Sequence, residues 1–293
     1  MKFQVSVVIP VFNSEKYLDK SVGSALALEE VLEVILIEDG STDNSLDKCQ
    51  VLAKDHKKVH LLTHDNGANN GVSASRNLGI KSARAPFIAF LDADDWYLPN
   101  RFTAEKELCE QGLDFDGVYG GTGFYYEDQD SLDTQELTTI PKKVNPEDLI
   151  MTFLDTTHDR FTTDAVTFKK TFLNRIGYFR ERMKLREDTH LWIRAAALGK
   201  VYAGLHKEAV AVRRVHESNT SRSLDQDSLR ILYSHLYHSL RREKSVRKDA
   251  MNLIFRRYIG TQTFSPWKRA LLATAELGRR PYMIDKVIFK SKV

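Results

Sequence analysis

Cysteine, membrane-length apolar runs and a leader-like start are scarce or missing in this sequence. Only Cys49 and Cys109 occur among 293 residues, with no C-x-x-C spacing, so neither a disulfide scaffold nor a zinc site is expected. No stretch approaches the roughly 18 consecutive apolar residues that a membrane span needs. The first residues run directly into an apolar stretch and show no signal-peptide layout. We therefore expect a cytoplasmic protein.

Charge is nearly balanced over the whole chain, with a formal net charge of +3, but it is unevenly placed. From Arg241 onward there are 14 Lys and Arg residues against four acidic residues. Basic amphipathic helices with aromatic residues suit an anionic membrane surface, so peripheral contact with the inner membrane face is one interpretation. The alternative is a solvated helix face packed on the rest of the chain. Nucleic acid is not expected as a partner, because no recognised binding module accompanies the charge.

Strands alternate with helices in the first part of the sequence. Apolar, largely β-branched runs predict strands at 5–11, 34–37, 59–62, 87–91 and 115–119. Helical periodicity predicts helices at 15–28, 45–52, 72–83 and 99–111. This alternation implies βαβ units, and therefore an α/β fold with a mostly parallel sheet flanked by helices.

The later part of the sequence is less regular. Residues 125–146 are polar and turn-rich, as expected of a surface excursion that could cover a site. Further strands are predicted at 165–168 and 210–212, a helix at 187–198, and a mobile loop at 213–219. From about residue 223 the pattern is helical, which favours a first domain over 1–222 and a basic helical C-terminal extension over 223–293.

The acidic run Asp92-Ala93-Asp94-Asp95 directly follows the apolar stretch 87–91. Its carboxylates therefore leave the sheet at a carboxyl end, where open α/β sheets bind ligands. Three carboxylates within four residues repel one another unless a cation lies between them. The run predicts a divalent-metal site for a phosphorylated ligand, and the alternative is a polar turn that ends a strand.

Two other strand ends should meet the same crevice. Asp39 ends the second predicted strand, and Pro10 and Asn13 end the first. Asp39 could accept a hydrogen bond from a nucleobase or ribose, although a turn followed by a helix N-cap would leave the same pattern. Arg76 lies near the start of the helix after Gly71, which suits phosphate recognition, with an ordinary solvated arginine as the alternative.

Acidic and basic groups farther along the chain complete the candidate site. Glu187 and Asp188 open a predicted helix, where acids often only cap the helix or complement its dipole. A carboxylate there could also act as a general base on an acceptor hydroxyl. His216, beside Arg213 and Arg214, could ligate a metal or contact a diphosphate, although a lone loop histidine often does neither.

In this order and spacing, these segments resemble the family 2 glycosyltransferases, which are inverting enzymes of the Rossmann-like GT-A fold that use nucleotide sugars. The resemblance covers 5–219 and is carried by 5–13, 38–43, 75–95 and Glu187-Asp188. One departure is Glu38 in Glu-Asp-Gly-Ser, where many relatives have a first aspartate. The Gln-x-x-Arg-Trp motif of processive synthases is absent, which implies transfer of one sugar per encounter.

The resemblance also implies roles for single residues. The Pro10 and Val11 backbone would frame the nucleobase, which Asp39 would read, while Asp188 would be the catalytic base. Asp92 and Asp94 would form the DxD motif, in contact with ribose and with Mn²⁺ or Mg²⁺. His216 would belong to a loop that closes on the metal and diphosphate. The remaining residues expected in nucleotide-sugar binding are Asn13, Arg76, Ala93 and Asp95.

The resemblance therefore implies a metal-dependent transfer from a nucleoside-diphosphate sugar, with a UDP-sugar as the family expectation. The acceptor would be a hydroxyl of a glycan or lipid-linked molecule in surface polysaccharide synthesis. A non-catalytic binding or scaffold protein that has kept the fold is an alternative. A nucleotidyltransferase is a further one, but the first strand is followed by Asn13-Ser14-Glu15 and not by a basic, glycine-rich phosphate loop.

Overall fold

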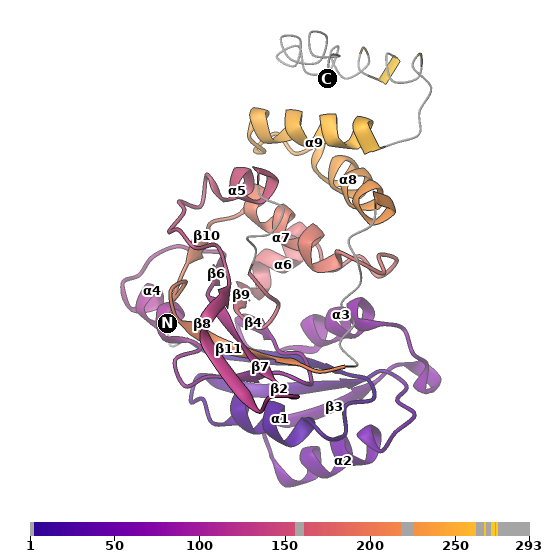
Figure 1. Cartoon of the computed structure of the whole chain (residues 1–293), viewed down its shortest axis with the longest axis vertical. Helices are drawn as coiled ribbons and strands as arrows, with labels where there is room; N and C mark the ends of the chain where they lie inside the picture. Colours follow the sequence, from indigo (N-terminus) through magenta and orange to yellow (C-terminus); the bar gives the residue numbers. More distant parts are fainter. Residues whose placement is uncertain are drawn as a thin grey trace.

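The computed structural model describes residues 3–155, 161–217 and 226–261, together with 267, 271, 272 and 274. Its centre is a seven-stranded sheet with the order β10-β6-β9-β4-β1-β2-β3 (Figure 1). Within this sheet only β9 runs antiparallel to its neighbours. The predicted α/β fold with a mostly parallel sheet is therefore confirmed. The strands are β1 (Val5–Val11), β2 (Val31–Glu38), β3 (Val59–Thr63), β4 (Phe87–Phe90), β6 (Gly117–Tyr119), β9 (Val166–Lys169) and β10 (Val201–Ala203).

Helices cover both faces of this sheet, because successive strand residues point to opposite sides. In β1, Val7 and Ile9 pack with α1 and α2, whereas Val8 joins the cluster that contains α3, α6 and α7. Both faces of the strands are thus buried, as expected of a parallel sheet. The helices are α1 (Leu18–Leu26), α2 (Ser45–Asp55), α3 (Val72–Ser82), α4 (Thr103–Glu110), α6 (Lys170–Ile176) and α7 (Glu187–Leu198).

A second, four-stranded sheet has the order β5-β11-β7-β8 and corrects three predictions. Trp96–Tyr97 forms β5 and pairs with β11, so α4 begins at Thr103 and not at the predicted 99. The predicted surface excursion contains β8 (Ser131–Thr138), which pairs with β7 (Gly121–Tyr126). The predicted mobile loop begins three residues too early, because β11 (Ala209–Val215) continues through Arg213, Arg214 and Val215 along β7.

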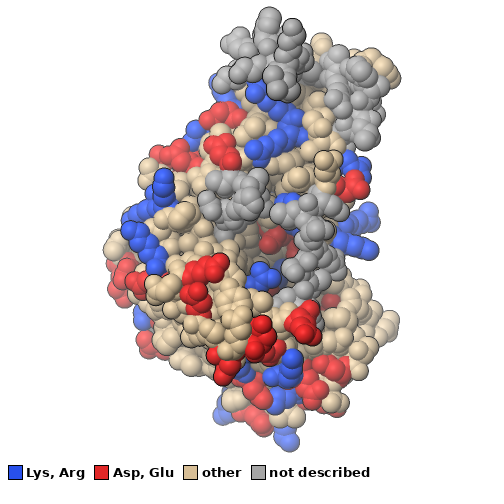
Figure 2. Space-filling view, in the orientation of Figure 1, with Lys and Arg blue, Asp and Glu red and all other residues tan. Residues whose placement is uncertain are grey.

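The C-terminal helices pack on the first part of the chain. Helices α8 (Gln226–Leu240) and α9 (Lys248–Thr261) contact α7 and α5 (Leu149–Asp155). Leu232 and Leu236 of α8 lie in the same buried apolar cluster as Trp192 of α7. Figure 2 shows Lys and Arg side chains exposed at this end of the molecule. The predicted boundary near residue 222 lies outside the described residues. Among those described, no helix is both long and apolar enough to cross a membrane.

Candidate active site

A cavity of about 960 Å³ lies outside the carboxyl ends of β1, β2 and β4. Chain segments far apart in sequence line it, from the end of β1 to the residue after β11. All the predicted site residues contribute to its wall: Pro10, Val11, Asn13, Asp39, Arg76, Asp92, Ala93, Asp94, Asp95, Asp188 and His216. The acids at three separate places in the sequence thus share one cavity.

The loops after β1 and β2 are fixed to each other at one end of the cavity. The Asn13 backbone is left-handed, with φ of 50°. Its Oδ1 accepts a hydrogen bond from Thr42 N at 2.8 Å, and its own N donates to Ser41 Oγ at 3.1 Å. Gly40 has φ of 72°, and a Cβ there would lie 2.8 Å from Gly67 O. Only glycine therefore fits this turn without displacing the neighbouring loop.

Asp39 is buried at the end of β2 and is held by the loop that precedes α3. Its two carboxylate oxygens accept hydrogen bonds from Asn70 N at 2.7 Å and Gly71 N at 2.9 Å. His64 Nε2 lies 3.5 Å from Oδ1. Each carboxylate oxygen has more than one lone pair, so the fixed group can still accept an N–H from a ligand.

Arg76 of α3 bridges two parts of the acidic wall. Its Nη2 lies 2.7 Å from Asp92 Oδ1, and its Nη1 lies 3.5 Å from Glu187 Oε1. Burial lowers the pKa of Arg76, but the charges of Asp92 and Glu187 outweigh burial, so the pKa is raised. The guanidinium therefore stays charged and ties the end of β4 to the start of α7. The role of Arg76 in phosphate recognition remains a prediction.

Asp164 is a site residue that the sequence reasoning missed. Its Oδ1 accepts a hydrogen bond from Asp92 N at 2.9 Å, and oxygens of Asp92, Asp95 and Asp164 lie within 4.8 Å of one another. Burial and the charge of Asp92 raise the pKa of Asp164 to about 7. Burial and the charge of Asp164 likewise raise the pKa of Asp95 well above its ordinary value. The two carboxyl groups are therefore suited to share a proton.

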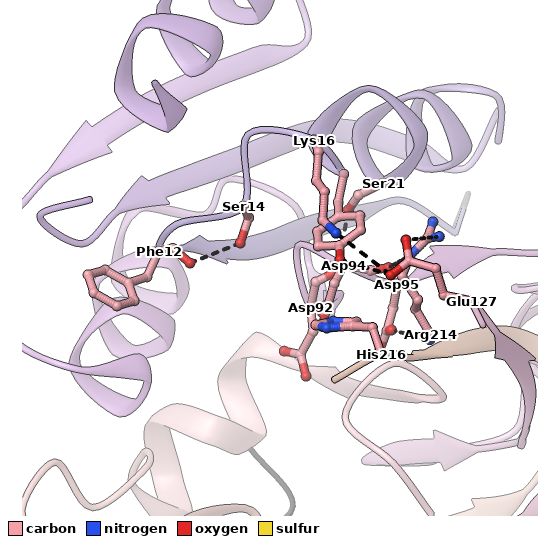
Figure 3. Close-up of polar contacts among 11 residues, drawn as sticks. Phe12, Ser14, Lys16, Ser21, Asp92, Asp94, Asp95, Glu127, Arg214 and His216 are labelled. Atoms are coloured by element: carbon pink, nitrogen blue, oxygen red, sulfur yellow. Dashed lines mark hydrogen bonds and ion pairs between the residues drawn. The ribbon is translucent and has the colours of Figure 1, made fainter. Parts of the chain in front are cut away.

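The opposite wall of the cavity brings Asp94 close to His216. His216 Nε2 lies 3.0 Å from Asp94 Oδ2, and the imidazole ring lies 5.2 Å from the ring of Tyr17. Figure 3 shows Asp94, Asp95, Arg214 and His216 together, with Phe12 and Ser14 farther along the site. A carboxylate oxygen and an imidazole nitrogen are ligand types that a divalent cation such as Mn²⁺ accepts. The predicted loop residues after Glu217 lie outside the described residues.

Arg214 fixes the backbone of the acidic loop, a contact that the sequence did not reveal. Its backbone N donates to Asp95 Oδ1 at 2.7 Å, and its Nε donates to Asp94 O at 3.1 Å. The guanidinium carbon lies 5.2 Å from the centre of the Trp96 ring and 5.1 Å from that of Tyr125. Arg213 and Arg214 point to opposite faces of β11. The sequence predicted a strand only over 210–212, so it did not show which of the two arginines faces the acidic loop.

The start of α7 supplies the remaining carboxylates. Asp188 Oδ1 accepts a hydrogen bond from Thr189 N at 2.5 Å, and Asp188 lines the same cavity as Asp39 and Asp94. Burial and the charge of Asp188 raise the pKa of Glu187, although Arg76 opposes that rise. The partly exposed carboxylate of Asp188 thus lies next to that of Glu187, which is paired with the guanidinium of Arg76.

Comparisons with known proteins identify a matching family and several relatives. The model of the family "Glycosyl transferase family 2" matches residues 6–181. An uncharacterized glycosyltransferase of Rickettsia typhi is 26% identical over 219 residues, which cover 74% of this chain and 65% of the relative. The succinoglycan biosynthesis protein ExoU of Rhizobium meliloti is 26% identical over 237 residues, which cover 75% of this chain and 66% of the relative. The chain thus spans about two thirds of the length of these relatives.

Solved structures show the same fold. The crystal structure of S. aureus TarS 1-349 in complex with UDP-GlcNAc superposes with a TM-score of 0.63 at 18% identity. The match covers 94% of this chain and 85% of that chain. A further crystal structure of TarS 1-349, in complex with UDP, gives a TM-score of 0.60. The predicted GT-A fold is therefore confirmed.

Proposed function

The chain belongs to glycosyl transferase family 2, and from that premise we propose that it transfers one sugar from a nucleoside-diphosphate sugar to a hydroxyl acceptor. The observation that carries the proposal is the single cavity that Asp39, Asp94 and Asp188 share. These residues come from the end of β2, the loop after β4 and the start of α7. Such a transfer requires a group that binds the nucleobase, a ligand for the metal and a general base for the acceptor hydroxyl, and we assign these roles to Asp39, Asp94 and Asp188 in that order.

The donor in this proposal is a UDP-sugar. The Pro10 and Val11 backbone would frame the base, and the fixed Asp39 carboxylate would accept an N–H from it. Asn13, Arg76, Asp92, Ala93 and Asp95 would line the path of ribose, diphosphate and sugar. Support comes from the crystal structures of TarS in complex with UDP-GlcNAc and with UDP.

The residues present suit a divalent cation, Mn²⁺ or Mg²⁺, held by Asp94 and His216. Their facing oxygen and nitrogen lie 3.0 Å apart in the cavity wall, and both are donor types that such ions accept. When bound, the cation would stabilise the negative charge that develops on the diphosphate leaving group. Asp92, Asp95 and Asp164, whose oxygens lie within 4.8 Å of one another, form a second group of carboxylates that could hold such a cation.

Asp188 is the proposed general base. Its carboxylate would take the proton of the acceptor hydroxyl while that oxygen attacks the anomeric carbon. The bond from the anomeric carbon to the diphosphate oxygen breaks as the new bond forms on the opposite face, so the configuration at this carbon inverts. Glu187 is held by Arg76, which leaves Asp188 as the less constrained carboxylate of the pair.

The proposed acceptor is a glycan or lipid-linked molecule of surface polysaccharide synthesis, reached at the cytoplasmic face of a membrane. One relative is named for succinoglycan biosynthesis. We further propose a catalytic domain over 1–222 and an extension over 223–293 that contacts anionic lipid through its basic residues. Of these, Arg242 and Lys244 are exposed and have no ion-pair partner among the described residues. One face of α8 and α9 packs on the first domain, through residues such as Leu232 and Ile254.

A donor panel distinguishes this function from the two alternatives. The protein is incubated with different UDP-sugars and Mn²⁺, and the release of nucleoside diphosphate is followed, with mass spectrometry of the products. Release that depends on an added acceptor supports a glycosyltransferase. Tight donor binding without turnover would instead indicate a binding module. Formation of UTP and sugar 1-phosphate from the UDP-sugar when pyrophosphate is added would indicate a nucleotidyltransferase.

A further inference from the structure

The residue immediately before Glu187 and Asp188 has an unusual backbone conformation. Arg186 lies in the left-handed region, with φ of 62° and ψ of 20°, and it occupies the N-cap position of α7. Residues other than glycine rarely adopt this conformation, because Cβ approaches the following carbonyl oxygen. Such a conformation persists where surrounding contacts enforce it, and it often marks a functional segment.

The contact that holds Arg186 comes from helix α8. Arg186 Nε donates a hydrogen bond to Ser228 Oγ at 2.9 Å, and the two residues are only 9% and 5% exposed. A hydrogen bond that is shielded from water in this way is costly to break, because both polar groups would be left without solvent. Arg186 also lines the cavity that contains Asp188. Helix α8 therefore reaches the edge of the candidate active site.

Helix α8 is fixed along its length against α7. Ser228, Leu232 and Leu236 recur at a spacing of four residues, so they lie on one face of α8, and all three are buried. At the far end of this face, Ser239 Oγ accepts a hydrogen bond from Arg180 Nη2 at 3.2 Å. Each serine thus accepts a hydrogen bond from an arginine, but the bond of Ser228 is buried and that of Ser239 is exposed. Only Ser228 bonds the residue next to the carboxylate pair. The apolar residues between them make the helix rigid against α7.

A rotation of the backbone at Arg186 would move both carboxylates. His190 N donates to Arg186 O at 2.9 Å, which closes the first turn of α7. Glu187 is bound to Arg76, and Asp188 accepts from Thr189 N, so both side chains depend on the direction in which α7 starts. Fixing Arg186 therefore fixes the direction of the Asp188 carboxylate within the cavity.

We propose that Arg186 is a positioning residue for the Asp188 carboxylate and that Ser228 of α8 holds Arg186 in place. Helix α8 of the C-terminal extension is then part of the active site. The inference rests on the proposed function, in which Asp188 is the general base. It assigns to α8 the task of aligning that base, which is separate from contact with lipid or with the sugar donor. Loss of the Arg186–Ser228 bond then lowers the rate of transfer and leaves donor binding intact.

The test compares Ser228→Ala with two controls in the full-length protein. Ser228→Thr keeps the hydroxyl group, and Ser239→Ala removes a serine hydroxyl that also bonds an arginine, at the far end of α8. With the UDP-sugar that the donor panel identifies, Ser228→Ala should lower kcat about tenfold or more, with donor KM and donor affinity by calorimetry unchanged. Ser228→Thr should restore kcat, and Ser239→Ala should keep the kcat of the wild type. A purely structural role of the buried bond would lower the thermal stability of Ser228→Ala and leave its kcat unchanged.

Amide hydrogen exchange tests the same bond without any turnover. The His190 amide, which donates to Arg186 O, should exchange about fivefold to tenfold faster in Ser228→Ala than in the wild type. Ser239→Ala should leave that amide unchanged. Unchanged exchange in Ser228→Ala would overturn the inference, as would a kcat equal to that of the wild type. If the wild type transfers no sugar from any donor, the proposed function fails, while the exchange experiment still decides whether α8 fixes the start of α7.

Discussion

Three carboxylates in the cavity are held by donors that belong to different parts of the chain. Asp39 accepts from the backbone before α3, Asp92 from Arg76, and Asp95 from the backbone N of Arg214. Such contacts orient the acids before any ligand arrives, which is how a protein avoids reorganising during a reaction. Substitutions of single residues in this set should therefore separate binding from chemistry.

The substitution Asp188→Asn removes the proposed base and keeps nearly the same side-chain volume. We expect transfer to fall by about 10²-fold to 10⁴-fold, the usual contribution of general base catalysis. The dissociation constant of the UDP-sugar, measured by calorimetry, should stay close to that of the wild type. Loss of donor binding in this variant would assign Asp188 to the donor site and leave the base unidentified.

Removal of the metal should stop transfer. Treatment with EDTA is expected to abolish nucleoside diphosphate release, and Mn²⁺ or Mg²⁺ should restore it. In His216→Ala the concentration of Mn²⁺ at half-maximal activity should rise about tenfold or more, because one ligand is lost. His206→Ala, at a histidine outside the cavity, serves as the control. Full activity in EDTA would contradict a role for a cation.

Arg76 should be a large contributor to stability. In Arg76→Met the carboxylates of Asp92 and Glu187 lose their buried partner, and removal of one member of such a set costs about 3 kcal/mol or more. We expect a loss of unfolding free energy close to about 3 kcal/mol and not far above it, because the Asp92 side chain is 36% exposed. Arg175→Met is the matched control, since its pair with Asp116 lies at the surface and should contribute less than about 1 kcal/mol. Urea denaturation measures both values, and equal losses would contradict the assigned difference.

At the scale of secondary structure, regular patterns could be predicted and long-range pairings could not. The ranges of β1 and α7 match the prediction residue for residue, because a β-branched run and a helical apolar spacing are local signals. Strand β8 was missed, since its residues Ser131–Thr138 are polar and exposed and gain their order from pairing with β7.

The missed site residue Asp164 has the same explanation. It directly precedes the predicted strand at 165–168, and in a fully parallel sheet that end would lie at the edge opposite to the carboxyl ends of the other strands. Because β9 runs antiparallel to β4 and β6, its N-terminal end lies at the edge where those parallel strands end. Strand direction depends on the fold of the whole chain, so local sequence gave no signal for Asp164.

Helix α7 also carries a buried histidine that should make stability depend on pH. Burial, followed by the charges of Arg194 and Arg180, holds the pKa of His190 well below its ordinary value of 6.5. The unfolded chain therefore binds a proton at this site that the folded chain does not, so stability falls as the pH drops below about 6.5. Neither ring nitrogen has a hydrogen-bond partner among the described residues. Replacement of the neutral ring by an apolar residue should therefore change the unfolding free energy little at neutral pH.

We expect His190→Leu to remove this part of the pH dependence. Between pH 7 and pH 5 the wild type should lose about 2 kcal/mol of unfolding free energy relative to the variant. Urea denaturation at several pH values measures the difference. Asp95, Asp164 and Glu187, whose pKa values are raised, shift stability in the opposite direction, but they are present in both proteins and cancel in the comparison. Parallel curves for the two proteins would show that His190 is not buried in its neutral form.

At the scale of the whole molecule, the extension combines two surfaces with different chemistry. Ile254 and Phe255 of α9 are buried in the cluster that also contains α5 and α7. The exposed basic residues Arg242 and Lys244 lie between α8 and α9. Deletion of 241–293 would therefore expose apolar core as well as remove charge. Charge substitutions at the surface are the cleaner test of membrane contact.

The double variant Arg242→Gln/Lys244→Gln should bind anionic vesicles more weakly than the wild type. Each basic residue near an anionic surface contributes about 1 kcal/mol, so loss of two should lower the partition coefficient about 30-fold. Lys54→Gln/Lys57→Gln removes the same charge from exposed positions at the end of α2 and just after it, at the opposite end of the molecule (Figure 1). Sedimentation with phosphatidylserine vesicles at low salt compares the three proteins. Membrane contact through the extension requires that only the first variant loses binding, because equal losses would mean that net charge alone, and not this surface, attracts the protein to lipid.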